Sequence, residues 1–189
     1  KARAVLRKDG SARAETSGAD MGQGAWTVLW QMAADGLGMA ADDIEFDIGH
    51  SDLSDGSVAG GAAHTASAGG ALFAAGNEVI RQLAEIATQD KDSPLFGAGN
   101  ERVLGDNGRL FKAEDPSVGE SYTDILQRAG IEEIEGKGRG NRDKASTETY
   151  AMFSHGAVFA EVKVDPNLFQ VRVTRLVGAF AAGRIINPK

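Results

Sequence analysis

The fold class is decided by residues 158–177, VFAEVKVDPNLFQVRVTRLV. In the first half of this stretch, apolar residues recur at every second position, which indicates a strand with one apolar face. Asp165-Pro166-Asn167 is typical of a turn, and apolar alternation resumes after it at Phe169 and Val171. The stretch therefore predicts a long antiparallel hairpin.

Toward the N-terminus, the sequence predicts about three helices. Apolar residues recur at helical spacing over residues 26–37, behind Gly22-Gln23-Gly24, and over residues 72–86, behind a polar and glycine-rich stretch. A shorter helix is predicted at residues 121–129 and ended by Gly130.

The remaining strand signals are also mostly antiparallel. Residues 2–16 predict a hairpin around Asp9-Gly10, and residues 101–113 predict another around Asn107-Gly108. Residues 44–48 alternate like a half-buried strand. Strands and helices do not alternate regularly, so we predict an α+β fold with mostly antiparallel strands and helices packed on them.

The chain has 189 residues, the size of a single domain, and we expect residues 1–189 to form one. Residues 136–149 contain Gly-Lys-Gly-Arg-Gly and lack apolar periodicity. We therefore expect a mobile, exposed loop at 136–149.

Composition excludes several classes of function. A net charge of -7 and an isoelectric point near 5.0 argue against nucleic acid or a membrane surface as partner. The chain has no cysteine, which excludes disulfides and thiolate metal sites, and it has no apolar run of about 18 residues.

Two of the predicted helices begin at a glycine-rich segment, which we call a helix entrance. The first is Gly22-Gln23-Gly24, and the second spans residues 60–67 and includes Thr65, Ala66 and Ser67. Helix N-termini offer unpaired amides and a positive dipole end, and small residues let an anion approach. Residues 14–80 contain no lysine or arginine, so an anion bound here would rely on backbone amides.

Other chemistries fit the sequence poorly. No lysine follows the glycines, so a P-loop is excluded. His50, His64 and His155 lack the short spacing of a zinc site, and we predict no metal ligand in this chain. Ser67 lacks the first glycine of a hydrolase nucleophile elbow. Trp26 and Trp30 are expected to be core residues rather than a ligand platform.

The order of these features resembles the molybdenum-binding large subunit of the xanthine dehydrogenase and aldehyde oxidase family. The resemblance rests on residues 19–24 (Ala-Asp-Met-Gly-Gln-Gly), on the glycine-rich residues 57–70 and on residues 178–188 (GAFAAGRIINP). Residues 62–64, Ala-Ala-His, depart from the more polar pattern often found there.

The resemblance implies a fragment of a molybdenum hydroxylase. Gly22, Gln23 and Gly24, with Thr65, Ala66 and Ser67, would form part of a cradle for molybdopterin or its cytosine dinucleotide. The family hydroxylates aldehydes or aromatic heterocycles with oxygen from water, and electrons leave through iron-sulfur clusters and FAD on other domains or subunits. The expected partners are the iron-sulfur and FAD domains or subunits and the remainder of the large subunit.

The resemblance also implies what this chain lacks. The family's catalytic glutamate follows the Asn-Pro element and would lie beyond Lys189, so we expect no catalytic residue here and an inactive fragment. Family members occur in cytoplasm and periplasm, and we favour cytoplasm. The alternative is a non-catalytic α+β interaction domain whose glycines serve packing only. Convergence of the two entrances on one surface would favour the cradle.

Overall fold

The computed structural model describes residues 1–53, 56, 58–61, 63–140, 148–151, 153–183 and 185. By their contacts, the residues divide into two compact units, Lys1–Asn141 and Arg142–Lys189, where the sequence suggests one domain. Most of the motif at residues 184–188 lies outside the described residues, as do residues 141–147 of the expected loop.

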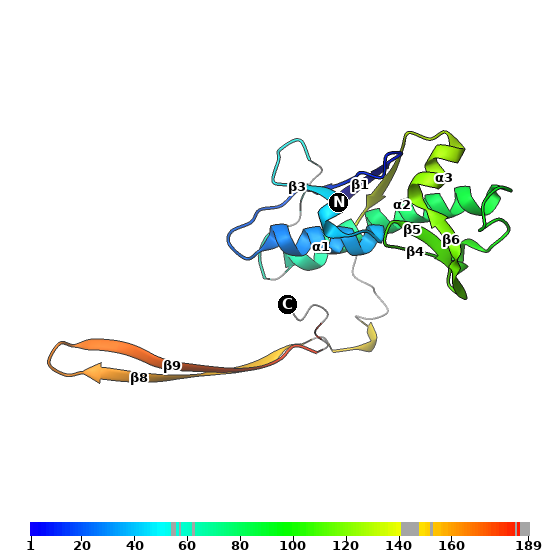
Figure 1. The fold of residues 1–189 in the computed structure, drawn as a ribbon. Helices are drawn as coiled ribbons and strands as arrows, with labels where there is room; N and C mark the ends of the chain where they lie inside the picture. Colours follow the sequence, from blue (N-terminus) through cyan, green and yellow to red (C-terminus); the bar gives the residue numbers. More distant parts are fainter. Residues whose placement is uncertain are drawn as a thin grey trace. The chain divides into compact units, whose positions relative to one another are not determined.

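The first unit is built on a four-stranded sheet of order β3-β2-β1-β7. Strand β1 is antiparallel to both β2 and β7, which confirms the N-terminal hairpin, whereas β2 and β3 are parallel. Helices α1 and α2 pack against each other and against one face of this sheet (Figure 1). The bounds are β1 Ala2–Arg7, β2 Ala12–Thr16, α1 Ala25–Leu37, β3 Ile44–Ile48, α2 Gly70–Gln89 and β7 Glu133–Gly138.

Small side chains on the helix-facing side of the sheet let α2 lie close to it. Ala4 in β1 is paired with Ala14 in β2 and with Gly136 in β7, so one row across three strands carries almost no side-chain volume. Helix α2 fills the space with a fully buried apolar stripe, Leu72, Ala75, Val79 and Leu83. This stripe confirms the helix predicted from its 3.6-residue period.

The expectation of a mobile loop over 136–149 is wrong at its beginning, because residues 136–138 belong to β7. The alternating glycines are the strand's packing face against α2. A Cβ atom on Gly138 would lie 2.5 Å from the backbone nitrogen of Ala75, and one on Gly136 would meet the backbone oxygen of the same residue. Period-2 glycines thus replace the apolar side chains that a strand normally shows.

A smaller antiparallel sheet, β4-β5-β6, completes the first unit together with α3. Strands β4 and β5 confirm the second predicted hairpin, while β6 was not predicted. Ser121 caps α3 by accepting a hydrogen bond from the backbone nitrogen of Asp124 at 3.0 Å, and Gly130 ends the helix with a φ of 67°. The bounds are β4 Val103–Asp106, β5 Arg109–Lys112, β6 Asp115–Ser121 and α3 Tyr122–Ala129, with short 3-10 turns η1 at Ala41–Asp43 and η3 at Asn100–Arg102.

The second unit contains the antiparallel hairpin of β8 (His155–Asp165) and β9 (Gln170–Ala181), which confirms the pattern at 158–177. In the part of the chain that the structure describes, three α-helices and mostly antiparallel strands confirm the α+β class. Within the described residues, no helix is long and apolar enough to span a membrane.

The prediction that both tryptophans are core residues is wrong for Trp26, which is 45% exposed and meets Phe46 edge-on. Trp26 lies in the first turn of α1, and its ring rests on Phe46 of β3. Trp30, one turn later, is half-buried and donates its indole N–H to the backbone oxygen of Ile44 at 3.1 Å.

Candidate functional site

Both glycine-rich entrances lie at the same edge of the four-stranded sheet. Because β2 and β3 are parallel and adjacent, their C-terminal ends meet at this edge, and the segments after Thr16 and Ile48 leave from it (Figure 1). The first segment leads to α1 and the second to α2. Crevices at the carboxyl ends of parallel strands are where open α/β sheets bind ligands, and this pair reproduces that arrangement locally.

The first entrance is an exposed turn that holds itself together. Gly22 and Gly24 have φ angles of 97° and 76°, and a Cβ atom on either would meet nothing within 4 Å. The Gln23 side chain accepts a hydrogen bond from the backbone nitrogen of Met21 at 2.6 Å and donates one to the backbone oxygen of Ala19 at 2.9 Å. The surface above Gly22 and Gly24 is therefore open, and Gln23 fixes its shape.

Asp20 occupies the N-terminal end of α1 with a carboxylate. Its Oδ1 accepts a hydrogen bond from the backbone nitrogen of Gly22 at 2.8 Å, and its Oδ2 accepts one from that of Trp26 at 3.2 Å. These amide donors, Gly22 first, lower the pKa of Asp20 below its usual 3.8. The prediction that the amides of this entrance meet an external anion therefore needs refinement, because the chain supplies its own anion there.

The second entrance has a different geometry. Residues Thr65–Gly69 form a π-helical turn, η2, that runs directly into α2, and its N-cap has no side-chain hydrogen bond. Thr65 and Ala66 are exposed and Ser67 is half-buried. Single π-helical turns are rare in proteins, and those that do occur are often at functional sites. In the described part of this entrance no carboxylate plays the role that Asp20 plays in the first.

Close contacts join the two entrances. His64 is buried, and its imidazole lies so close to Gly18 that a Cβ atom there would come within 2.5 Å of Nε2. Gly56 similarly lies against Ser17, where an added Cβ atom would be 2.8 Å from the hydroxyl oxygen. The residues before the first entrance therefore pack directly on the segment that contains the second, and the two converge on one surface.

Basic side chains reach the same edge of the sheet from other strands. A cavity of about 510 Å³ is lined by the end of β7 and the start of β1, and by Asp52 and Leu53 of the segment after β3. Lys137 and Arg139 line it, on the side of β7 opposite to its packing glycines. The Nζ atom of Lys137 also lies 2.7 Å from Oε1 of Glu135. Hydrogen bonds from Lys137 and Arg3 lower the pKa of Glu135. Lys137 and Arg139 therefore lie near Asp52 and Leu53, although residues 14–80 contain no lysine or arginine themselves.

Two other chemistries find no support in the described residues. No group of three histidine, cysteine or acidic side chains there could hold a metal ion. Ser67 is half-buried, and the imidazole of His64, three residues before it, packs on Gly18. A serine hydrolase requires an imidazole within hydrogen-bond reach of the serine hydroxyl.

Comparison with known proteins identifies one family. The family model described as the molybdopterin cofactor-binding domain matches residues 1–189. The chain is 26% identical to the aldehyde oxidoreductase molybdenum-binding subunit PaoC of Escherichia coli (strain K12), over 100% of this chain and 24% of that protein. It is 29% identical to subunit gamma of the 6-hydroxypseudooxynicotine dehydrogenase complex of Paenarthrobacter nicotinovorans, over 97% of this chain and 23% of that subunit.

Solved structures with the same fold cover nearly the whole chain. Quinoline 2-oxidoreductase from Pseudomonas putida 86 matches 99% of it with a TM-score of 0.73 and 23% identity. The Cu,Mo-CO dehydrogenase matches 99% with a TM-score of 0.73 and 21% identity. The chain spans 24% and 23% of these two structures, respectively, so it corresponds to about a quarter of each longer protein.

Proposed function

The chain belongs to the molybdopterin cofactor-binding domain family, and on that premise we propose that residues 22–24 and 65–67 form one wall of a molybdopterin cradle. This proposal rests on the convergence of the two entrances: His64 of the second packs against Gly18, which precedes the first. The parallel pairing of β2 with β3 brings both helix starts to one end of the sheet, and Gly22 and Gly24 do not serve packing there, because a Cβ atom on either would meet nothing within 4 Å.

The two entrances would have different roles toward the cofactor. Thr65 and Ala66 are exposed residues near the start of a long helix, and the unpaired amides of a helix start suit a phosphate or pyrophosphate group. The first entrance suits neutral contacts, because the Asp20 carboxylate already accepts its amides and would repel a phosphate placed on them. Gln23 would face the cofactor with the second hydrogen of its amide nitrogen, since the first is donated to Ala19.

When bound, the molybdenum cofactor supplies the redox centre of an oxidoreductase. The parent enzyme would hydroxylate an aldehyde or an aromatic heterocycle with oxygen from water, and pass two electrons to iron-sulfur clusters and FAD on other domains or subunits. The names of the relatives, an aldehyde oxidoreductase subunit and a dehydrogenase subunit, support this class of reaction. Residues 1–189 would hold and orient the cofactor, and the catalytic base would come from the remainder of the subunit.

Two finer points belong to the same proposal. The cofactor would be molybdopterin or its cytosine dinucleotide, and the enzyme would be cytoplasmic rather than periplasmic. Acid hydrolysis of the purified full-length subunit distinguishes the cofactor forms, because only the dinucleotide releases cytidine monophosphate. Cell fractionation followed by detection of the subunit checks the location.

The experiment that tests the proposed function compares the full-length subunit with the 189-residue chain. The full-length subunit, purified with its partner subunits, should contain molybdenum and oxidise an aldehyde or a heterocycle in the presence of an electron acceptor. The 189-residue chain should fold and show no such oxidation. A full-length protein that folds without molybdenum when the cofactor is available would instead favour the non-catalytic interaction domain.

A further inference from the structure

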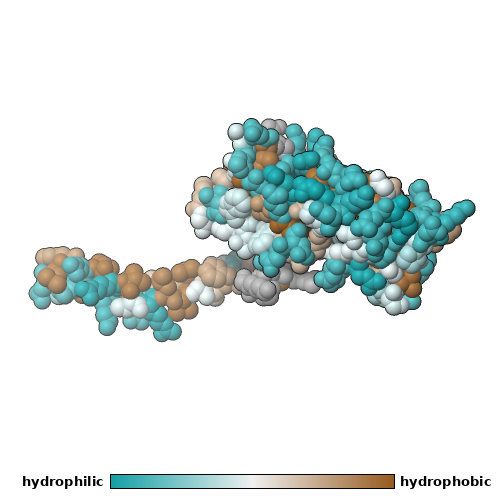
Figure 2. All heavy atoms as spheres, turned by 45° about the horizontal axis from the view of Figure 1, so that its top comes forward, coloured by the Kyte–Doolittle hydropathy of each residue, from teal (hydrophilic) through white to brown (hydrophobic). Residues whose placement is uncertain are grey.

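The hairpin of the second unit carries one continuous apolar face that its own unit leaves open. Every second residue of β8 from Val158 to Val164 is apolar, and the partners of these residues in β9 lie on the same side. Figure 2 shows apolar residues gathered along the hairpin. Seven of the side chains on this face are between 50% and 75% exposed: Val158, Val162, Val164, Val171, Val173, Leu176 and Phe180.

A β-bulge makes this face continuous. In β9 the apolar residues change from odd positions, Val171 and Val173, to even positions, Leu176 and Phe180, so a regular strand would place the two pairs on opposite sides. The register shifts between Glu161 and Val162, which leaves Thr174 as the extra residue. The Thr174 hydroxyl donates to the backbone oxygen of Glu161 at 3.2 Å and so fixes the bulge.

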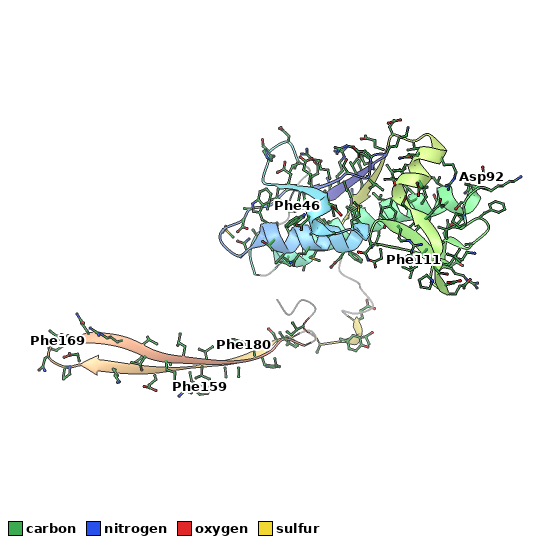
Figure 3. The ribbon with its side chains drawn as sticks, viewed as in Figure 1. Phe46, Asp92, Phe111, Phe159, Phe169 and Phe180 are labelled. Carbon is green, nitrogen blue, oxygen red and sulfur yellow. The ribbon has the colours of Figure 1, made fainter. Side chains whose placement is uncertain are left out.

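The opposite face of the hairpin has a different composition. Toward the turn it carries charged pairs, Glu161 opposite Arg175 and Lys163 opposite Arg172. Phe159, near the middle of β8, belongs to this opposite face, whereas Phe180, near the base of the hairpin, belongs to the apolar face (Figure 3). The hairpin is therefore amphipathic over its outer half, with one face suited to water and the other to an apolar cover.

We propose that this apolar face is covered by polypeptide of the same subunit that lies outside residues 1–189. A two-stranded hairpin alone is at best marginally stable in water, so a permanent cover is required. The face contains no charged residue, which is typical of a domain core or an obligate interface rather than a transient one. The inference rests on the chain being part of a longer subunit. Residues 1–189 match only 24% of PaoC, so a subunit of similar length would contain further polypeptide that can cover this face.

The test compares two neighbouring positions that point to opposite faces. Val162→Cys and Lys163→Cys are introduced separately into the full-length subunit, and the rate of alkylation at each position is followed by peptide mass spectrometry. We expect alkylation at position 162 to be slower than at 163 by about tenfold or more, since it requires local opening. In the 189-residue chain, both positions should react rapidly. Ala160→Cys and Glu161→Cys form a second pair for use if Val162→Cys fails to fold.

Each other outcome overturns the proposal. Equal rates at both positions in the full-length subunit would mean that the face is not covered. Protection of position 162 that depends on adding the other subunits, or on protein concentration, would assign the face to a partner subunit or to a second copy. Protection already present in the 189-residue chain would assign the cover to residues 1–141. None of these results depends on cofactor binding, so the cradle is tested separately.

Discussion

The imidazole of His64 lies against Gly18, at a distance that leaves no room for a Cβ atom on the glycine. Gly18 precedes the first glycine-rich entrance and His64 precedes residues 65–67 of the second. This contact, with that of Gly56 on Ser17, helps to set the spacing between the two halves of the proposed cradle, although the residues are far apart in the sequence.

Gly18→Ala should disturb this spacing. The added methyl group would overlap a buried imidazole, and overpacking of this kind costs about 1–3 kcal/mol. Urea unfolding of the 189-residue chain measures the loss. Gly60→Ala is the matched control, because its Cβ atom would lie 3.7 Å from Val58 in ordinary contact. Equal stability of the two variants would show that the His64 contact gives way without cost.

Gly138→Ala should weaken the packing of β7 on α2. Its Cβ atom would lie 2.5 Å from the backbone nitrogen of Ala75, and two backbones cannot separate as easily as two side chains. We expect a loss of about 1–3 kcal/mol in the free energy of unfolding. Lys137→Ala removes only an exposed ion pair with Glu135 and should change stability by less than about 1 kcal/mol. If residues 136–138 were a mobile loop, both substitutions would be neutral.

Asp20→Asn should reduce stability in a pH-dependent manner. The amides of Gly22 and Trp26 lower the pKa of Asp20, so the ionised carboxylate stabilises the folded chain above its usual pKa of 3.8. That stabilisation is lost as the pH falls through the lowered pKa of the folded state. The difference in urea midpoint between wild type and Asp20→Asn should therefore be present at about pH 7 and shrink in strong acid. Asp35→Asn, an exposed acid on the same helix, is the control; a pH-independent difference for Asp20→Asn would contradict the assignment.

Much of the fold could be predicted because its signals are local. The hairpins at residues 2–16 and 158–177 and the helix at 72–86 show clear period-2 or 3.6-residue patterns. Strand β7 could not be recognised from apolar periodicity, because two of its three buried positions, Gly136 and Gly138, are glycines that contact backbone. The alternation of glycine with Lys137 and Arg139 was the available signal, with small residues toward the helix and cations away from it.

The candidate site was predicted only in part. Gly22–Gly24 and Thr65–Ser67 could be named from sequence, but their convergence depends on the parallel pairing of β2 with β3, a contact between segments separated by a helix. The hydrogen bonds of Asp20 and the approach of Lys137 and Arg139 are likewise tertiary. The exposure of Trp26 follows from its position in the first turn of α1, which no periodicity resolves.

The most direct test of the cradle measures molybdenum content and melting temperature on the same preparations of the full-length subunit. The variants are Gln23→Ala and Ser67→Ala, with Leu72→Ala as a core control. For Ser67, at the entrance assigned to the phosphate, loss of one hydrogen bond to a charged group is worth about 1.5–3 kcal/mol, or roughly 10-fold to 150-fold in affinity. For Gln23, loss of one neutral hydrogen bond is worth about 0.5–1.5 kcal/mol, or roughly 2-fold to 13-fold. Leu72→Ala should instead cost about 2–5 kcal/mol of folding stability.

We expect Gln23→Ala and Ser67→Ala to lower the bound molybdenum per folded subunit. The cofactor-free Ser67→Ala protein should melt near the wild-type temperature, and cofactor-free Gln23→Ala, which also loses two exposed hydrogen bonds of the turn, should melt only slightly lower. Leu72→Ala should instead lower the melting temperature of the cofactor-free protein. If Gln23→Ala and Ser67→Ala lower the melting temperature of the cofactor-free protein as much as Leu72→Ala does, and bound molybdenum per folded subunit stays normal, the two entrances serve packing only and the cradle is contradicted.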